Sequence, residues 1–321
     1  MDKLAEAGKP RLLSEYCEYG DRKSLPLSVK IKRQLKKIPG TLYLAKALRG
    51  LKARPLYSGG AKAKRKTLRF DVHICDHCNL NCKGCSNFCP IAEKKFVGLD
   101  ILERDFKRLS ELTGRKCELS LMGGEPLLHP DIIKIFDITR KYFDCGVQLL
   151  TNGILLANQP DEFWQSCKRH AIKIVVSVYP VKINEEKIIA QARKYGVALA
   201  ALDRTGASSW LKHPLDLSGS RNIEKTYRKC GWGNVCIYLE DGKLDPCGFP
   251  LLTKHFNKYF DKGGHKFAEP SEEDYVDIFK VKSLDEILEK LAGPIPYCRH
   301  CTLNFSRHKW EASKKEISEW V

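Results

Sequence analysis

Three closely spaced cysteines are the strongest chemical signal in the chain. They lie in the segment CNLNCKGC, with three residues between Cys78 and Cys82 and two between Cys82 and Cys85. Soft thiolates at this spacing can converge on one metal ion or cluster. Structural zinc and electron-carrying cubanes usually take four protein ligands, so three leave one metal position open for chemistry. The alternatives are a closed zinc site, with Cys75 or Cys89 as fourth ligand, and a ferredoxin-like electron carrier.

A second signal is the segment GGEP, from Gly123 to Pro126, which follows a short apolar run. Glycine has no Cβ, so its backbone can approach a ligand closely. On its own the segment indicates only a turn. Its position at the end of a predicted strand gives it weight, because barrel enzymes build their sites from the loops at the carboxyl ends of strands.

The two segments together resemble the radical S-adenosylmethionine (SAM) superfamily. The resemblance implies that Cys78, Cys82 and Cys85 hold a [4Fe-4S] cluster whose open iron binds SAM. It also implies that Gly123, Gly124 and Glu125 form the loop that holds the methionyl amino group of SAM. The expected reaction is reductive cleavage of SAM to a 5′-deoxyadenosyl radical, which abstracts hydrogen from a substrate. A one-electron donor such as flavodoxin or ferredoxin is the expected partner.

Four further residues bear on SAM binding. Asn152 and Ser177 come at the ends of predicted strands, where similar enzymes contact the ribose and the methionyl carboxylate, although either residue suits a turn or cap equally well. The residue before the third cysteine is often an aromatic that lies along the adenine, but here it is Gly84. Adenine contact must therefore come from elsewhere, and Phe88 is the nearest aromatic, with core packing as the alternative.

A second group of cysteines lies in the last third of the chain and resembles the auxiliary-cluster domain of the SPASM and twitch type. The implied ligands of a second [4Fe-4S] cluster are Cys230, Cys247, Cys298 and Cys301, with Cys236 as a substitute for Cys230. Four protein ligands would close such a cluster, which favours electron transfer or structural support. A zinc tetrathiolate is the competing interpretation, because four cysteines in two pairs suit tetrahedral zinc as well.

Short apolar runs alternate with helical periodicity from residue 67 onward, which predicts repeated βα units and a parallel sheet. Right-handed crossovers let such units curl, so the expected fold is α/β, a partial (β/α)6 TIM-like barrel with a small cysteine-rich module. After about residue 205 the alternation stops, and CIYLEDGKLDPC predicts a hairpin that turns at Asp-Gly. The expected domains are a basic helical extension at 1–66, the barrel at 67–215 and the auxiliary module at 216–321.

The predicted strands occupy residues 67–74, 117–122, 147–153, 172–180 and 197–202. The predicted helices occupy residues 100–114, 131–143, 161–170, 185–196 and 283–293.

The net charge of +17 is concentrated in residues 1–66, which hold 18 Lys and Arg against 5 Asp and Glu. Within them, residues 28–38 predict a cationic amphipathic helix. Such a helix can pack on the main domain, and residues 28–66 can also make peripheral contact with an anionic membrane. Nucleic acid is not favoured, because no recognisable reader motif accompanies the charge.

Location and redox state follow from what the chain contains. We see no apolar run long enough for a membrane span and no secretory signal, so we expect a cytoplasmic protein, with membrane contact at most peripheral. Reducing compartments rarely use structural disulfides, so metal ligation best explains most of the 14 cysteines.

The resemblance, together with the basic extension, implies radical hydrogen abstraction from a carbohydrate-type substrate, ending in a net oxidation. Modification of a peptide or protein is the alternative, and the non-enzymatic alternative is a metal-binding adaptor. No catalytic base can be assigned from the sequence, because many Asp, Arg and Tyr residues are available and no motif selects one.

Overall fold

The computed structural model describes residues 68–114, 117–206, 210–230, 233 and 237–321. The expectations for the extension at 1–66 and for Cys236 lie outside these residues. The expected α/β barrel with a parallel sheet is confirmed, and each strand and helix predicted between residues 67 and 202 corresponds to one in the structure.

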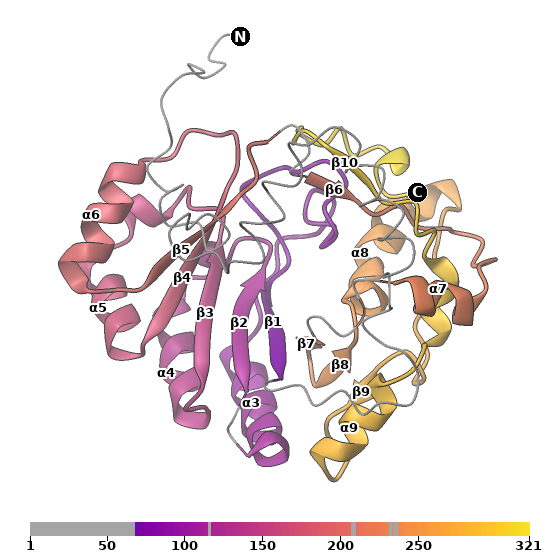
Figure 1. Ribbon diagram of the computed structural model, residues 1–321, viewed down its shortest axis with the longest axis horizontal. Coiled ribbons are helices and arrows are strands. Elements are labelled where there is room, and N and C mark those ends of the chain that lie inside the picture. The colour runs from indigo at the N-terminus through magenta and orange to yellow at the C-terminus, as the bar shows by residue number, and fades with distance from the viewer. Residues whose placement is uncertain (1–67, 115–116, 207–209, 231–232, 234–236) are drawn as a thin grey trace, which may run out of the picture.

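Five parallel strands form the curved half of the barrel, in the spatial order β5-β4-β3-β2-β1 (Figure 1). Their bounds are β1 Arg69–Cys75, β2 Glu118–Gly123, β3 Gly146–Thr151, β4 Ile172–Val178 and β5 Leu199–Asp203. Alternate residues of β1 show how the sheet divides its two faces. Phe70, Val72 and Ile74 belong to the main apolar core, whereas Asp71 and His73 belong to the other face and are also buried.

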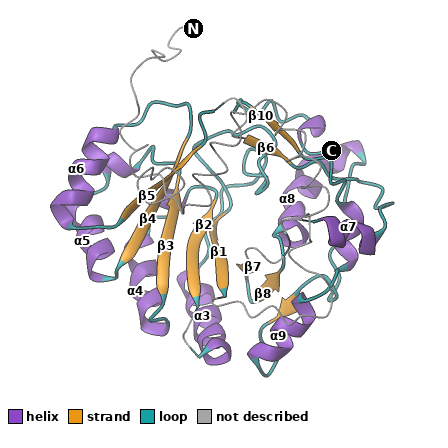
Figure 2. Ribbon diagram, viewed as in Figure 1, coloured by secondary structure: helices purple, strands orange, loops and turns teal. Residues whose placement is uncertain are grey.

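Four helices pack along the outside of the strand fan (Figure 2). Their bounds are α3 Leu99–Thr113, α4 Ile132–Tyr142, α5 Asp161–Arg169 and α6 Glu185–Tyr195. Each helix turns an apolar face to the sheet, as Phe106 of α3 and Phe136 of α4 illustrate, because both are fully buried in the main core. Helices α3 and α6 end at Gly114 and Gly196, which adopt the left-handed conformation common after helices.

The predicted hairpin is confirmed as β7 (Ile237–Glu240) and β8 (Lys243–Asp245). Asp241 and Gly242 turn between them with φ of 46° and 73°, as the favoured two-residue turn requires. Strand β7 also pairs in parallel with β1. The sheet thus continues through β7 and β8 to β9 (Val276–Asp277), across the boundary expected at residue 215.

The remaining elements pack beside the open edge of the barrel. They are β6 Trp210–Lys212, α7 Ile223–Lys229, α8 Phe249–Phe260, α9 Leu284–Leu291 and β10 Ser306–His308, with short 3-10 helices between them. An aromatic core that includes Phe88, Phe249, Phe256 and Trp320 joins α8 and residue 320 near the end of the described chain to the loop after β1. In the part of the chain that the structure describes, no helix is both long and apolar enough to cross a membrane.

Candidate functional site

The candidate site residues gather at one edge of the sheet. Parallel strands place their carboxyl ends at the same edge, and the three-cysteine loop follows β1 there while the GGEP segment begins at the end of β2. Asn152 follows β3, and Ser177 lies near the end of β4. Both are buried, with exposures of 6% and 7%. The fold therefore brings the two sequence motifs and both predicted strand-end residues to the same edge.

The two glycines of GGEP allow their loop to cross the backbone that leads to the first cysteine. The Gly124 N–H donates to the Cys75 carbonyl at 2.6 Å, and the Glu125 N–H donates to the His77 carbonyl at 3.0 Å. A Cβ at Gly123 would lie 2.4 Å from the Cys75 oxygen, and one at Gly124 would lie 1.9 Å from the His77 oxygen. Any side chain at either position would force the two loops apart.

Glu125 braces this junction from inside the protein. Its carboxylate accepts hydrogen bonds from the Thr151 hydroxyl at 2.7 Å, the Asn152 N–H at 2.8 Å and the Leu127 N–H at 3.0 Å. The side chain is fully buried, and burial raises its pKa to about 7 against the lowering effect of these donors. With three donors on its two oxygens, Glu125 fixes the GGEP loop to the end of β3.

Asn152 carries the same network to the cysteine loop. Its side-chain amide donates to the Asn79 side-chain oxygen at 2.8 Å and lies 3.5 Å from the Cys78 sulfur. Its own side-chain oxygen accepts the Ile154 N–H at 3.0 Å, which closes the turn after β3. Asn152 is therefore both a turn residue and a neighbour of the first candidate ligand.

The three thiols form one electrostatic group. Burial raises the pKa of Cys78 to about 12 and raises that of Cys82 further, with Cys85 and Cys78 adding to the effect on Cys82. A hydrogen bond from Cys89 lowers the pKa of Cys85 to about 7. Buried thiolates without a cation are costly, and a bound iron cluster removes that cost by displacing the protons. The donor set therefore fits a [4Fe-4S] cluster.

The two flanking cysteines behave differently. The Cys75 sulfur lies 3.1 Å from the His77 carbonyl and 3.5 Å from the His77 Nδ1. Cys89 is buried and hydrogen-bonded to Cys85. Of the two candidates for a fourth ligand, only Cys89 lies beside the three-cysteine set.

Phe88 is part of the core. It is fully buried, and its ring lies 6.0 to 6.4 Å from the rings of Phe249, Phe256 and Trp320. No face of this ring is free for an adenine, so the suggested cofactor contact is wrong and the core-packing alternative is confirmed.

The later cysteines meet around one cavity. Cys230 ends α7, Cys247 precedes α8, and Cys298 and Cys301 lie in and directly after the 3-10 helix Pro296–His300. All four line one cavity. Burial raises the pKa of Cys298 to about 11 and that of Cys301 to about 12, and neighbouring thiols of the group add to both shifts.

These four thiols surround the cavity without converging on a point. Within the described residues, no three or more His, Cys, Asp or Glu side chains are placed to hold a single metal ion, and this applies to Cys78, Cys82 and Cys85 as well as to these four thiols. In a cubane, each thiolate binds a different iron, so its ligands stand around the cluster.

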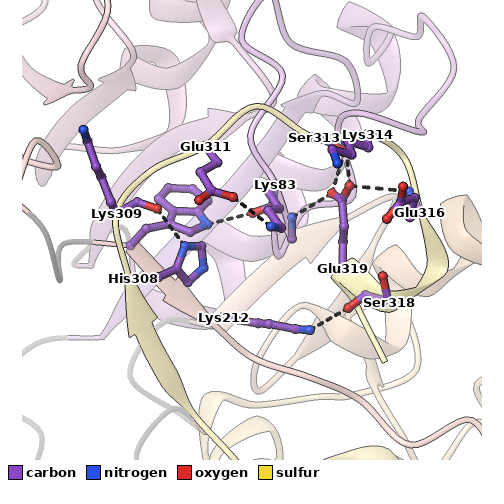
Figure 3. Close-up of polar contacts among 12 residues, drawn as sticks. Lys83, Lys212, His308, Lys309, Glu311, Ser313, Lys314, Glu316, Ser318 and Glu319 are labelled. Carbon is purple, nitrogen blue, oxygen red and sulfur yellow. Dashed lines mark hydrogen bonds and ion pairs between the residues drawn. The ribbon is translucent and has the colours of Figure 1, made fainter.

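A segment that the sequence analysis did not connect with the site covers the three-cysteine loop. This segment, residues 306–321, is called the strap below. Ala312 bridges to Cys82, the Lys83 N–H donates to the Glu311 carbonyl at 3.0 Å, and the Lys83 amine bonds the Glu311 carboxylate at 2.8 Å (Figure 3). No local pattern predicts this contact, because more than 220 positions separate Lys83 from Glu311.

Glu319 fastens the strap. Its buried carboxylate accepts hydrogen bonds from the Ser313 hydroxyl and the Lys314 N–H, both at 2.6 Å, and from the Gly84 N–H at 3.3 Å (Figure 3). Although burial acts to raise it, these donors hold the pKa of Glu319 below its ordinary value. Gly84 has φ of 61°, and a Cβ there would lie 2.8 Å from the Glu319 carbonyl. The strap thus occupies the space beside Gly84.

Comparison with known proteins agrees with this site. Residues 72–203 match the Radical SAM superfamily. A probable GTP 3′,8-cyclase of Thermoplasma volcanium is 28% identical over 94 residues, which are 29% of this chain and 28% of the relative. GTP 3′,8-cyclase 3 of Mycobacterium tuberculosis is 27% identical over 154 residues, 45% of this chain and 39% of the relative. The matches thus span well under half of each relative's length.

Two solved structures align with parts of the chain at low identity. BtrN in complex with AdoMet and 2-DOIA is 16% identical with a TM-score of 0.47, over 79% of this chain and 98% of that one. The anSMEcpe structure with bound AdoMet and Cp18Cys peptide is 16% identical with a TM-score of 0.35, over 63% of this chain and 49% of that one.

The parallel half-barrel, with a three-thiol loop braced by GGEP at its carboxyl edge, defines a class of enzyme that binds a cluster with an open iron. That class is the radical SAM superfamily, which residues 72–203 match. This part of the chain is therefore of the radical SAM type, whose cofactors are a [4Fe-4S] cluster and SAM.

Proposed function

We propose that this enzyme abstracts hydrogen from a carbohydrate-type substrate and completes a net oxidation with the help of a second [4Fe-4S] cluster. The observation that carries the proposal is the cavity lined by Cys230, Cys247, Cys298 and Cys301. Four protein thiolates leave no iron for a substrate, so a cluster held there suits electron transfer. A substrate radical that gives up an electron becomes an oxidised product.

The residues of the barrel edge have separate tasks in this proposal. Cys78, Cys82 and Cys85 hold the SAM-binding cluster, and the backbone of the GGEP loop holds the methionyl amino group. Asn152 and Ser177 contact the rest of SAM. When bound, the cluster supplies the electron that cleaves SAM to methionine and a 5′-deoxyadenosyl radical. The protein orients the two reactants and excludes water and oxygen.

Glu125 keeps its position during this chemistry because its three hydrogen bonds are all to this chain. These bonds support a role in orienting the GGEP loop. The backbone atoms of the GGEP loop are then held in a fixed position at the end of β2, ready to bind the cofactor.

Modification of a peptide or protein is the second candidate. The curated relatives are named as GTP 3′,8-cyclases, and they match only part of the chain.

The basic residues 1–66 favour a substrate that is anionic or lies at an anionic surface, such as a carbohydrate bearing phosphate or lipid.

The first experiment reconstitutes the chain anaerobically with iron and sulfide and adds dithionite and SAM. Wild type, Cys82→Ala and the double variant Cys298→Ala/Cys301→Ala are compared for iron content and 5′-deoxyadenosine. We expect product from the wild type, none from Cys82→Ala, and loss of about half of the iron in the double variant. If the four-cysteine site holds zinc, and the iron content of the double variant equals that of the wild type, the second cluster is rejected.

The second experiment addresses the substrate. Cyclitols, amino sugars, sugar phosphates and short peptides are added one at a time, and 5′-deoxyadenosine is measured with and without each compound. A carbohydrate that raises the rate and gains a carbonyl supports the proposal. Stimulation by peptides alone would transfer the assignment to peptide modification.

A further inference from the structure

Three indole side chains converge on the short section that carries the second and third cysteines of the loop. Trp210 of β6 donates its Nε1–H to the Lys83 carbonyl at 2.7 Å. Trp320 of the strap donates its Nε1–H to the Cys85 carbonyl at 2.9 Å. These bonds fix the backbone carbonyls of Lys83 and Cys85 from outside the loop.

The third indole belongs to the strap where it crosses the cysteine loop. Ala312, two residues after Trp310, bridges to Cys82, and the Glu311 carbonyl accepts the Lys83 N–H at 3.0 Å. The Nε1 of Trp310 is buried and has no hydrogen-bond partner among the described residues. A buried N–H without a partner is costly, and a sulfur of a cluster held at Cys82 would supply the missing acceptor.

The indoles are held firmly in these positions. The Tyr179 ring, directly after β4, lies 5.7 Å from the Trp210 ring and 6.2 Å from the Trp310 ring. The Trp320 ring stacks on Phe88 at 6.0 Å with an angle of 28° between the planes, and the Trp320 carbonyl accepts the Leu215 N–H at 2.7 Å. Packing of this kind fixes the direction of each N–H.

We propose that Trp210, Trp310 and Trp320 form a tryptophan clamp that positions the Cys82–Cys85 section and sets the reduction potential and the retention of its [4Fe-4S] cluster. The inference rests on the assignment of Cys78, Cys82 and Cys85 as ligands in the proposed function. The Trp310 N–H stabilises the more negative, reduced cluster by hydrogen-bonding a ligand sulfur, and therefore raises its potential. Trp210 and Trp320 keep the ligand backbone in place when the cluster exchanges electrons.

The test compares Trp210→Phe, Trp310→Phe and Trp320→Phe with Trp164→Phe. Trp164 on α5 is a matched control, because it is fully buried and its Nε1 also lacks a hydrogen-bond partner among the described residues. The reconstituted full chain is used. The measurements are the midpoint potential of the cluster whose EPR signal changes on SAM addition, the rate of iron release to a chelator, and near-UV circular dichroism.

We expect Trp310→Phe to shift the midpoint potential of that cluster to a more negative value. We expect Trp210→Phe and Trp320→Phe to release iron about tenfold faster than the wild type. Phenylalanine keeps an aromatic ring at each position, so near-UV spectra should retain the folded signature. Trp164→Phe should match the wild type in both potential and iron release.

Two negative results have different meanings. If the wild type shows no cluster that responds to SAM, the ligand assignment in the proposed function fails. If the wild type shows that cluster and the three variants match Trp164→Phe in both potential and iron release, the clamp is rejected while the proposed function stands. If one variant does not fold, the other two decide the outcome.

Discussion

At the scale of single residues, burial and hydrogen bonding compete on Glu125. Burial disfavours its charged form, and three donors favour that form. Burial dominates, so the pKa stands at about 7 rather than the ordinary 4.5. Between these two values the folded chain holds a proton on Glu125 that the unfolded chain has released. The folded state therefore loses stability as the pH rises through this window.

Replacement of Glu125 by Gln should remove this contribution to the pH dependence. The variant should also lose about 1 to 3 kcal/mol of stability, because the new side-chain NH2, in place of the second carboxylate oxygen, cannot accept from the Asn152 N–H. Urea unfolding of both proteins without SAM at pH 5, 6, 7 and 8 measures both effects. Equal slopes of stability against pH in the two proteins would show that Glu125 titrates normally.

The cysteines before the loop give a second prediction at this scale. The Cys75 sulfur is directed to His77, whereas the Cys78 sulfur lies beside Asn152. Cys75→Ala should retain the iron and the SAM-dependent EPR change, and Cys78→Ala should lose both. Iron analysis and EPR of the two reconstituted variants make the comparison. Loss of iron in Cys75→Ala would restore the zinc or four-ligand interpretation that uses this cysteine.

At the scale of elements, the strands and helices of the barrel could be predicted because each follows from a local pattern. The short apolar runs and the helical periodicity between residues 67 and 202 can be recognised without knowledge of distant contacts. The hairpin followed from Asp241-Gly242, whose dipeptide selects its own turn. The strap could not be predicted, since residues 306–321 carry no strong periodicity and their partners lie in the loop after β1. Helix α8 was missed because Gly248 and Pro250 at its start resemble a turn.

Gly84 tests the fit between the strap and the cysteine loop. Gly114 has a similar φ of 62°, but no atom of a non-neighbouring residue that the structure describes lies within 4 Å of the place that a Cβ would take there. Gly114 therefore serves as the control for Gly84, with its φ of 61°. Alanine at either position should cost about 1 to 2 kcal/mol for the left-handed backbone. Gly84→Ala should cost more, because it must also displace Glu319, and only this variant should lose iron faster. Thermal unfolding and iron release of the two variants are compared, and equal losses would contradict the fit.

At the scale of the whole molecule, positive charge and chemistry are separated. Residues 1–66 hold 18 of the 56 Lys and Arg, whereas the cysteine sites lie after residue 74. The charge distribution could be predicted from the sequence. The binding partner of the basic segment could not, because lysines at a lipid surface and lysines in water have the same spacing. The continuity of the sheet from β1 into β7 was equally hidden, since pairing between distant strands leaves no local mark.

Binding to anionic vesicles should depend on this basic segment. Each Lys or Arg near such a surface contributes about 1 kcal/mol, and salt screens the attraction. We expect the full chain to sediment with vesicles that contain phosphatidylserine, and to be released as the salt concentration rises. A variant with Lys32, Lys36 and Lys37 changed to Gln should bind more weakly. Equal binding of both proteins to neutral vesicles would point to apolar contact instead.

The pairing of β1 with both β2 and β7 has a consequence for synthesis of the chain. As the ribosome releases residues 69–203, β1 has one bare edge and the cysteine loop has no cover, because β7 and the strap have not yet emerged. An unpaired strand edge attracts other chains. Cluster insertion before the strap is made would therefore act on an open loop. Slow translation between β5 and the strap should lower the yield of active enzyme through aggregation.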